Sequence, residues 1–172
     1  MRSRVDTAAM TSSCESREPV AGSGAPRCPR SGTKGPAVEL LTVKALLGAL
    51  ALRSVRQGLY RFCADPTCAV VYFDEAGQVF ETADLRVPVW QKEAPGARMM
   101  CYCFGENEAA MAREVAETGR CDAALRVRAD IAAGRCACQV RNPRGTCCLG
   151  DVVRAAAHIE AQAGAVRQAD CG

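Results

Sequence analysis

The chain has 172 residues, which is enough for one ordinary domain or two small ones. Its net charge of only +3 argues against a strong nucleic-acid binder or a protein of the membrane surface. Its 12 cysteines and single histidine exclude sites that need two imidazoles on this chain, and they leave all-thiolate metal chemistry open.

Residues 1–27 are rich in Ser, Arg, Gly, Ala and Pro and show no periodicity, which predicts a disordered tail. They contain no apolar run of the length that a secretory signal needs, and no later stretch is long enough to span a bilayer. We therefore expect a cytoplasmic protein that does not insert into a membrane. Its cysteines would stay reduced and bind metal rather than form disulfides.

Residues 28–93 carry the pattern of a small helix-plus-hairpin unit. Apolar residues at helical spacing predict a helix from about 43 to 56, with Thr42 as its N-cap and Gly58 ending it. Segments rich in Val and aromatic residues then predict strands, at 59–62, 69–73, 78–81 and 87–90.

A short linker at 93–97 precedes a helical unit at 98–165. Asn107 is the predicted cap of a helix at 108–118 that Gly119 ends, and a second helix is expected near 123–133. A third helix begins around Cys147 or Cys148 and continues to about 163. The fold class is therefore α+β, with the strands concentrated in the first unit.

Six cysteines of the second unit fall into three close pairs, Cys101-x-Cys103, Cys136-x-Cys138 and Cys147-Cys148. Several of them stand near predicted helix starts, where the helix dipole favours the thiolate. Four soft thiolates without histidine select zinc or iron–sulfur. The spacing favours an iron–sulfur cluster, with zinc and then disulfides or reactive thiols as the alternatives.

In the first unit, Cys63 and Cys68 stand at the two ends of a turn, and the natural partner of this pair is Cys28. A second cysteine three residues after Cys28 would complete a four-thiolate zinc site, but Ser31 occupies that position. A serine hydroxyl is a poor zinc ligand at neutral pH. The three thiolates therefore need a fourth ligand, for which the candidates are Asp65, water and Cys14.

Four segments in the same order resemble the N-terminal domain of the CopZ-type copper chaperones, namely Cys63–Phe73, Lys92-Glu93, Cys101–Gly105 and Asn142–Val152. The resemblance covers about residues 28–157. It implies a zinc-binding helix-plus-hairpin unit followed by a helical unit that holds a [2Fe–2S] cluster. The second unit is similar to the bacterioferritin-associated ferredoxin fold.

Carried over by motif, the resemblance implies four cluster ligands and three zinc ligands. The cluster would be held by Cys101, Cys103, Cys138 and Cys148, with Cys136 and Cys147 as rivals within their pairs. Zinc would be held by Cys28, Cys63 and Cys68, with Ser31 at a position where the family often has cysteine. This departure affects the expected zinc site and not the cluster.

The function implied by the resemblance is soft-metal handling with one-electron transfer, such as the reduction of copper(II) to copper(I). The expected partners are a copper or mercury carrier or transporter, or another redox protein. The alternative is a ferredoxin-like electron carrier, or a redox or iron sensor, unrelated to copper. The sequence contains no Cys-x-x-Cys copper loop, so we expect an accessory domain without the copper-carrying domain of full-length chaperones.

The sequence also lacks the motifs that would indicate catalysis. It contains no glycine-rich phosphate loop and no Gly-x-Ser-x-Gly motif, and no carboxylate pair has an evident mechanistic spacing. We therefore expect a protein that is not an enzyme and that has no nucleic-acid partner.

Overall fold

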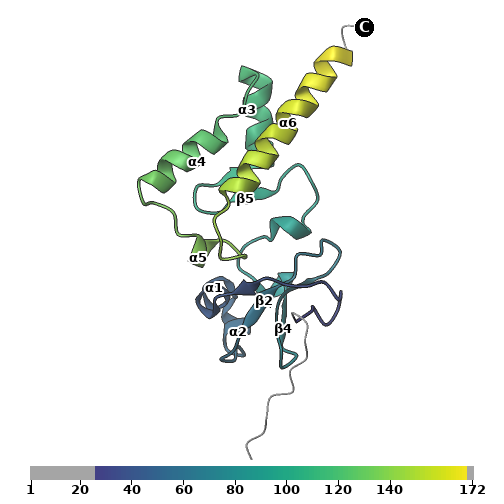
Figure 1. Cartoon of the computed structure of the whole chain (residues 1–172), viewed down its shortest axis with the longest axis vertical. Coiled ribbons are helices and arrows are strands. Elements are labelled where there is room, and N and C mark those ends of the chain that lie inside the picture. The colour runs from purple at the N-terminus through teal and green to yellow at the C-terminus, as the bar shows by residue number, and fades with distance from the viewer. Residues whose placement is uncertain (1–25, 170–172) are drawn as a thin grey trace, which may run out of the picture.

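The computed structural model describes residues 26–169 (Figure 1). The first group of elements comprises β1 (Ala37–Val38), α1 (Leu40–Leu46), α2 (Ala49–Leu52), β2 (Tyr60–Phe62), β3 (Val70–Asp74), β4 (Val79–Glu81) and the 3-10 turns η1 (Thr82–Asp84) and η2 (Trp90–Lys92). The second group comprises β5 (Met99–Cys101), β6 (Glu106–Asn107), α3 (Glu108–Thr118), α4 (Ala123–Ala132), α5 (Cys138–Arg141) and α6 (Leu149–Ala169).

This mixture of helices and sheets agrees with the expected α+β class. Most of the predicted N-terminal tail, together with Cys14 and Cys171, lies outside the described residues. Within the described residues, no helix is both long enough and apolar enough to cross a membrane.

The first group folds around an antiparallel sheet with the strand order β1-β2-β3-β4. In the register, Phe62 pairs with Tyr72, and Tyr72 in turn pairs with Phe80. These aromatic side chains are buried together with Val43 and Leu47 from the α1 region. The core therefore lies where α1 packs on the sheet, and it consists of aromatic and β-branched residues as strand propensity favours.

Strand β3 carries four consecutive buried residues instead of an alternation, because an irregularity in its pairing with β4 falls between Val70 and Tyr72. Val71 and Tyr72 join the main core of the sheet. Val70 and Phe73 instead pack with Cys28, Cys63 and Cys68. One strand thus supports the aromatic core on one side and a group of cysteines on the other.

The predicted helix over 43–56 is wrong, because the chain forms two short helices with a break at Leu47-Gly48. Leu47 is extended and bridges to Leu85, and the N–H of Gly48 donates to the carbonyl of Asp84 at 2.7 Å. Thr42 is buried inside α1 and is not its N-cap. Leu50, one of the apolar residues at helical spacing in the predicted helix, is 84% exposed and does not face the core.

The three strands predicted at 59–62, 69–73 and 78–81 correspond to β2, β3 and β4. The strand predicted at 87–90 is wrong, since this segment leads into the 3-10 turn η2. Strand β1 and helix α5 were not predicted, and each spans four residues or fewer. Segments this short carry too little periodicity to be recognised.

Four helices and the β5–β6 hairpin form the second group. Asn107 caps α3 as predicted, with its side-chain oxygen accepting from the N–H of Ala110 at 2.9 Å. Gly119 ends α3 in the left-handed conformation at φ 82°, which glycine adopts without strain. The buried core between α3, α4 and α6 includes Met111, Val127 and Val152.

The two groups of elements are joined by specific contacts, and Figure 1 shows the sheet at one end and α3, α4 and α6 at the other. The buried hydroxyl of Tyr72 in β3 donates to the carbonyl of Pro143 at 2.8 Å. The backbone N–H of Trp90 donates to the hydroxyl of Tyr102 at 3.1 Å. The division into units at 28–93 and 98–165 stays a prediction.

Candidate metal centres

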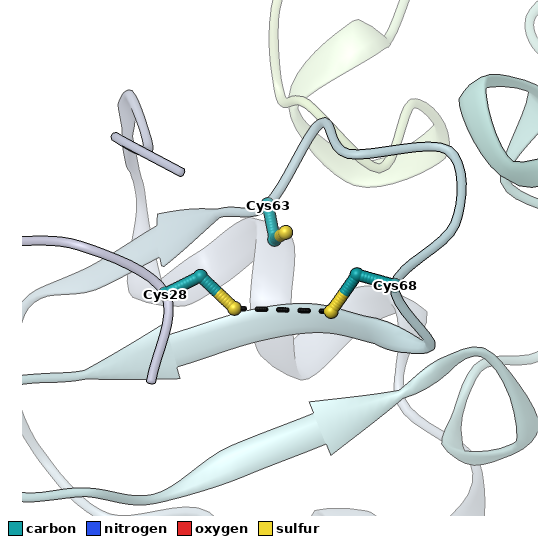
Figure 2. A group of neighbouring side chains, drawn as sticks. All are labelled: Cys28, Cys63 and Cys68. Carbon is teal, nitrogen blue, oxygen red and sulfur yellow. Dashed lines mark hydrogen bonds between the residues drawn. The ribbon is translucent and has the colours of Figure 1, made fainter. Parts of the chain in front are cut away.

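The first candidate centre consists of Cys28, Cys63 and Cys68, whose sulfur atoms all lie within 4.8 Å of one another. All three side chains are buried. Figure 2 shows the sulfurs of Cys28 and Cys68 directed toward one another, and the Sγ–Sγ distance is 3.9 Å. These are the three residues for which the sequence predicted zinc, and the fold brings them together from two separate segments.

Backbone hydrogen bonds hold each of these cysteines. Cys28 lies in a turn closed by its own N–H, which donates to the carbonyl of Thr33 at 2.9 Å. Gly32 allows this turn through its left-handed φ of 71°. Cys63 extends the pairing of β2 with β3, because its N–H donates to the carbonyl of Val71 at 2.9 Å. The sheet therefore fixes one arm of the site and a glycine-containing turn fixes the other.

The loop between Cys63 and Cys68 is held from outside by Lys92. The ammonium of Lys92 donates to the carbonyl of Asp65 at 2.8 Å and to the carbonyl of Cys68 at 2.9 Å. Lys92 lies in one of the motifs that carry the family resemblance, but that motif alone implies no role for it. Lysine is usually a solvent-exposed residue, so no signal in the sequence alone indicated these two contacts.

Ser31 also lies at this centre, with its hydroxyl oxygen 3.5 Å from the sulfur of Cys63. Asp65, which the sequence offered as a fourth ligand, has a carboxylate oxygen that accepts from the N–H of Thr67 at 2.9 Å and from its hydroxyl at 2.8 Å. These two bonds lower the pKa of Asp65 and direct that carboxylate oxygen into its own turn.

The thiols of Cys28 and Cys63 have opposite pKa shifts. Burial raises the pKa of Cys63, because it removes the thiolate from water. Burial acts in the same direction on Cys28, but hydrogen bonds from the N–H and hydroxyl of Ser31 and from the N–H of Arg30 outweigh it and lower the pKa to about 7. Cys28 is therefore the thiol of this pair that is more readily present as a thiolate.

The second candidate centre contains four cysteines in two close pairs. The sulfur of Cys148 donates to the sulfur of Cys101 at 3.0 Å. The sulfurs of Cys103 and Cys138 lie 3.9 Å apart. These are the four residues that the resemblance implies as cluster ligands, and all four are buried or half-buried.

Cys136 and Cys147, the alternative ligands within their sequence pairs, are both exposed. In both sequence pairs, Cys136-x-Cys138 and Cys147-Cys148, the predicted ligand is thus the less exposed of the two cysteines. The assignment of four ligands stays a prediction, and the burial favours it over the assignment with Cys136 and Cys147.

Each of the four cysteines occupies the end of an element or a tight turn. Cys101 is the last residue of β5, and its carbonyl accepts from the N–H of Gly105 at 2.8 Å in the turn that contains Cys103. Cys138 is the first residue of α5, and the N–H of Ala137 before it donates to the sulfur of Cys103 at 3.3 Å. Cys148 directly precedes α6, and its carbonyl accepts from the N–H groups of α6's first turn.

The thiol pKa values follow from this pairing. The hydrogen bond from Cys148 lowers the pKa of Cys101 to about 6, and the same bond raises the pKa of Cys148. Burial and the neighbouring Cys103 raise the pKa of Cys138 to about 12. The pairs therefore lie close enough to share protons, and a metal cation would replace those protons at the same sulfurs.

Two ion pairs to a buried aspartate support the loop that carries Cys148. Asp151 in the first turn of α6 accepts from the guanidinium of Arg144 at 3.1 Å, and Arg154 donates to its other oxygen. The side chain of Asp151 is only 5% exposed. The sequence analysis assigned no role to this aspartate, although it lies within one of the motifs that carry the resemblance.

Comparison with known proteins identifies relatives for both halves of the chain. Residues 25–86 match the zf_CopZ family, which is described as a zinc binding domain. Over 123 residues the chain is 37% identical to the copper chaperone CopZ of Archaeoglobus fulgidus. The aligned region covers 71% of this chain and 57% of that relative. The chain thus spans little more than half the length of this curated relative.

The X-ray structure of the Archaeoglobus fulgidus CopZ N-terminal domain superposes with a TM-score of 0.61 at 31% identity. The match covers 74% of this chain and 95% of that structure. The zinc-binding family match and the three clustered cysteines together support zinc as the ion of the first centre. From these matches, we conclude that the chain contains a domain of the CopZ N-terminal type.

Proposed function

We propose that this chain holds a [2Fe–2S] cluster and a zinc ion and acts in copper handling as a one-electron donor to copper(II). The observation that carries the proposal is the arrangement of four cysteine sulfurs as two close pairs, at 3.0 and 3.9 Å. A [2Fe–2S] cluster takes four cysteine thiolates, two at each iron. The donor set therefore fits the cluster in number, in chemistry and in its division into pairs.

The protein surroundings suit this group. A tetrahedral ion with metal–sulfur bonds of about 2.3 Å separates two thiolate sulfurs by about 3.8 Å. The Cys103–Cys138 distance of 3.9 Å matches that value. The Cys101–Cys148 distance of 3.0 Å is shorter, as expected for two thiols joined by a hydrogen bond, and binding of a metal ion would lengthen it. The N–H of Ala137 donates to the sulfur of Cys103, and hydrogen bonds to cluster sulfurs are one way in which a protein sets the reduction potential.

When bound, a reduced [2Fe–2S] cluster supplies one electron, so that copper(II) becomes copper(I) and the cluster returns to its oxidised form. A one-electron reductant would then be needed for each further copper ion. The chain's own residues hold the sulfurs in place and keep Cys101 and Cys148 away from water. The exposed Cys147 directly precedes Cys148, and the exposed Cys136 lies two residues before Cys138. Both are soft donors that copper(I) accepts.

The role in copper handling is supported by the relative, whose name is that of a copper chaperone. Such a role is that of a metal carrier rather than an enzyme, and it implies a copper carrier or transporter as the partner. Zinc in the first centre would be structural, because the three thiolates are buried and tie a turn to two strands.

The proposal can be tested by adding copper(II) to the dithionite-reduced, desalted protein under anaerobic conditions. We expect about one copper(I) per cluster, trapped by a copper(I)-specific chelator, with simultaneous return of the oxidised cluster's visible absorption. A variant with Cys103 and Cys138 both changed to Ser serves as the control and should form no copper(I) beyond the background of free thiols. Reoxidation without copper(I) would contradict the role in copper reduction.

A further inference from the structure

The zinc centre has three cysteine donors, whereas structural zinc sites are almost always four-coordinate and tetrahedral. A fourth donor must therefore come from elsewhere in the chain or from solvent. Within the described residues, the group of metal-binding side chains at this place consists of Cys28, Cys63 and Cys68, with no histidine or carboxylate among them. In addition to these three thiols, the hydroxyl of Ser31 contacts the sulfur of Cys63.

The distances fit a tetrahedron with one oxygen corner. With zinc–sulfur bonds of about 2.3 Å and a zinc–oxygen bond of about 2.0 Å, two sulfurs lie about 3.8 Å apart and a sulfur lies about 3.5 Å from the oxygen. The structure has 3.9 Å between the sulfurs of Cys28 and Cys68, and 3.5 Å between the Ser31 oxygen and the sulfur of Cys63. Both edges therefore have the length that a zinc ion would impose.

The backbone also helps to fix the position of the Ser31 hydroxyl oxygen. The N–H of Thr33 donates to the Ser31 hydroxyl oxygen at 3.3 Å, which helps to hold that oxygen beside the sulfur of Cys63. The turn from Cys28 to Gly32 closes through a backbone bond of 2.8 Å, which places residues 28 and 31 on the same side of the turn. Asp65 is less suited, because its carboxylate already accepts two bonds from Thr67.

We infer that the Ser31 hydroxyl oxygen is the fourth donor of the zinc ion, giving a site of three thiolates and one oxygen. This inference rests on the proposed zinc site. Coordination to zinc lowers the pKa of a bound oxygen ligand strongly, as it does for zinc-bound water, and this compensates for the weak donor strength of a free serine hydroxyl.

The test measures zinc affinity by chelator competition, and the donor set by the visible spectrum of the cobalt(II)-substituted full chain. We expect Ser31→Ala to weaken zinc binding by at least about tenfold, the lower end of losses seen for residues that support metal sites. Ser31→Cys should bind more tightly than the native chain. Its sulfur-to-cobalt charge-transfer intensity should rise by about one third, from three thiolates to four. Ser54→Ala, a change of an exposed serine in the same unit, should alter neither measurement.

Two outcomes would overturn the inference while leaving the zinc site intact. Equal zinc affinity and equal cobalt spectra in native and Ser31→Ala protein would assign the fourth position to water or another group. An unchanged charge-transfer intensity in Ser31→Cys would show that position 31 does not face the metal. If the native chain bound neither zinc nor cobalt, the proposed zinc site itself would fail.

Discussion

Lys92 holds the loop of Cys68 from outside that loop, with its ammonium 2.9 Å from the Cys68 carbonyl oxygen and 2.8 Å from that of Asp65. Lys92 is the last residue of the 3-10 turn η2, and Trp90 is its first. Trp90 packs against the core between α3, α4 and α6, and its backbone N–H donates to the hydroxyl of Tyr102. Tyr102 in turn lies between Cys101 and Cys103 in sequence. A short run of contacts therefore joins the loop of Cys63 and Cys68 to the turn that carries Cys101 and Cys103, two of the proposed cluster ligands.

Lys92→Met should destabilise the protein, because it leaves two carbonyls of the loop of Cys63 and Cys68 without their charged donor. Hydrogen bonds to charged groups contribute about 1.5–3 kcal/mol each, and the partial exposure of Lys92 places the expected loss of unfolding free energy at about 1–3 kcal/mol. The check is urea unfolding followed by circular dichroism. Lys34→Met, a change of an exposed lysine, should cost less than about 0.5 kcal/mol. Equal effects of the two changes would contradict the role of Lys92.

Tyr72→Phe should weaken the contact between the two groups of elements. The buried Tyr72 hydroxyl donates to the Pro143 carbonyl at 2.8 Å, and its removal leaves a buried carbonyl unpaired. We expect a loss of about 1–3 kcal/mol of unfolding free energy. Ser54→Ala is the control, since it removes an exposed hydroxyl that donates to the carbonyl of Ala51 and should cost less. The prediction fails if the Ser54 variant is the less stable of the two.

The choice of cluster ligands predicts that the two cysteines of Cys136-x-Cys138, and likewise those of Cys147-Cys148, respond differently to replacement. Cys138→Ser and Cys148→Ser should lose most of the bound iron or change the cluster's spectrum, because they remove a half-buried and a buried sulfur donor. Cys136→Ser and Cys147→Ser remove exposed thiols and should keep iron content and visible absorption near those of the native chain. Iron analysis and the electron paramagnetic resonance spectrum of the reduced variants provide the measurement. A full native spectrum in Cys138→Ser would reassign that ligand.

Stability at acid pH should depend on Glu114 in α3. Hydrogen bonds from Arg126 lower the pKa of Glu114 to about 2, below its ordinary value of 4.5. A carboxyl group whose pKa is lower in the folded state stabilises the protein above the unfolded-state value. This contribution is lost progressively as the pH falls from about 4.5 to about 2.

The corresponding measurement compares the native chain with Glu114→Gln over that pH range. Acid also protonates the metal-binding thiolates, so the informative quantity is the difference in unfolding free energy between the two proteins at each pH. We expect the native chain to be more stable at pH 7, with the difference shrinking toward pH 2. A difference independent of pH would show that the ion pair does not contribute.

The sequence predicts the elements whose limits depend on local signals. Helix α3 begins after Asn107 and ends at Gly119 as predicted, because the cap and the left-handed glycine act within a few residues of the helix. The break between α1 and α2 depends instead on Leu85 and Asp84, which lie far along the chain. No local pattern contains that information, so the helix predicted over 43–56 was too long.

The same distinction holds for the metal centres. The spacing of Cys63 and Cys68 around a turn indicates a metal site, and the fold brings Cys28 to it. The sequence could not determine which cysteines pair in the second group, because Cys101 meets Cys148 across 47 residues. The sequence indicated residue 31 as the position of a fourth ligand, although it did not favour the Ser31 hydroxyl as a donor. It could not indicate Lys92, whose two contacts exist only once the turns have formed.

The central claim, that one chain holds a [2Fe–2S] cluster beside a zinc ion, is tested most directly by metal analysis after anaerobic purification. We predict a red-brown protein with about two irons, two acid-labile sulfides and one zinc per chain. A colourless protein that binds zinc alone, even after reconstitution with iron and sulfide, would contradict the account.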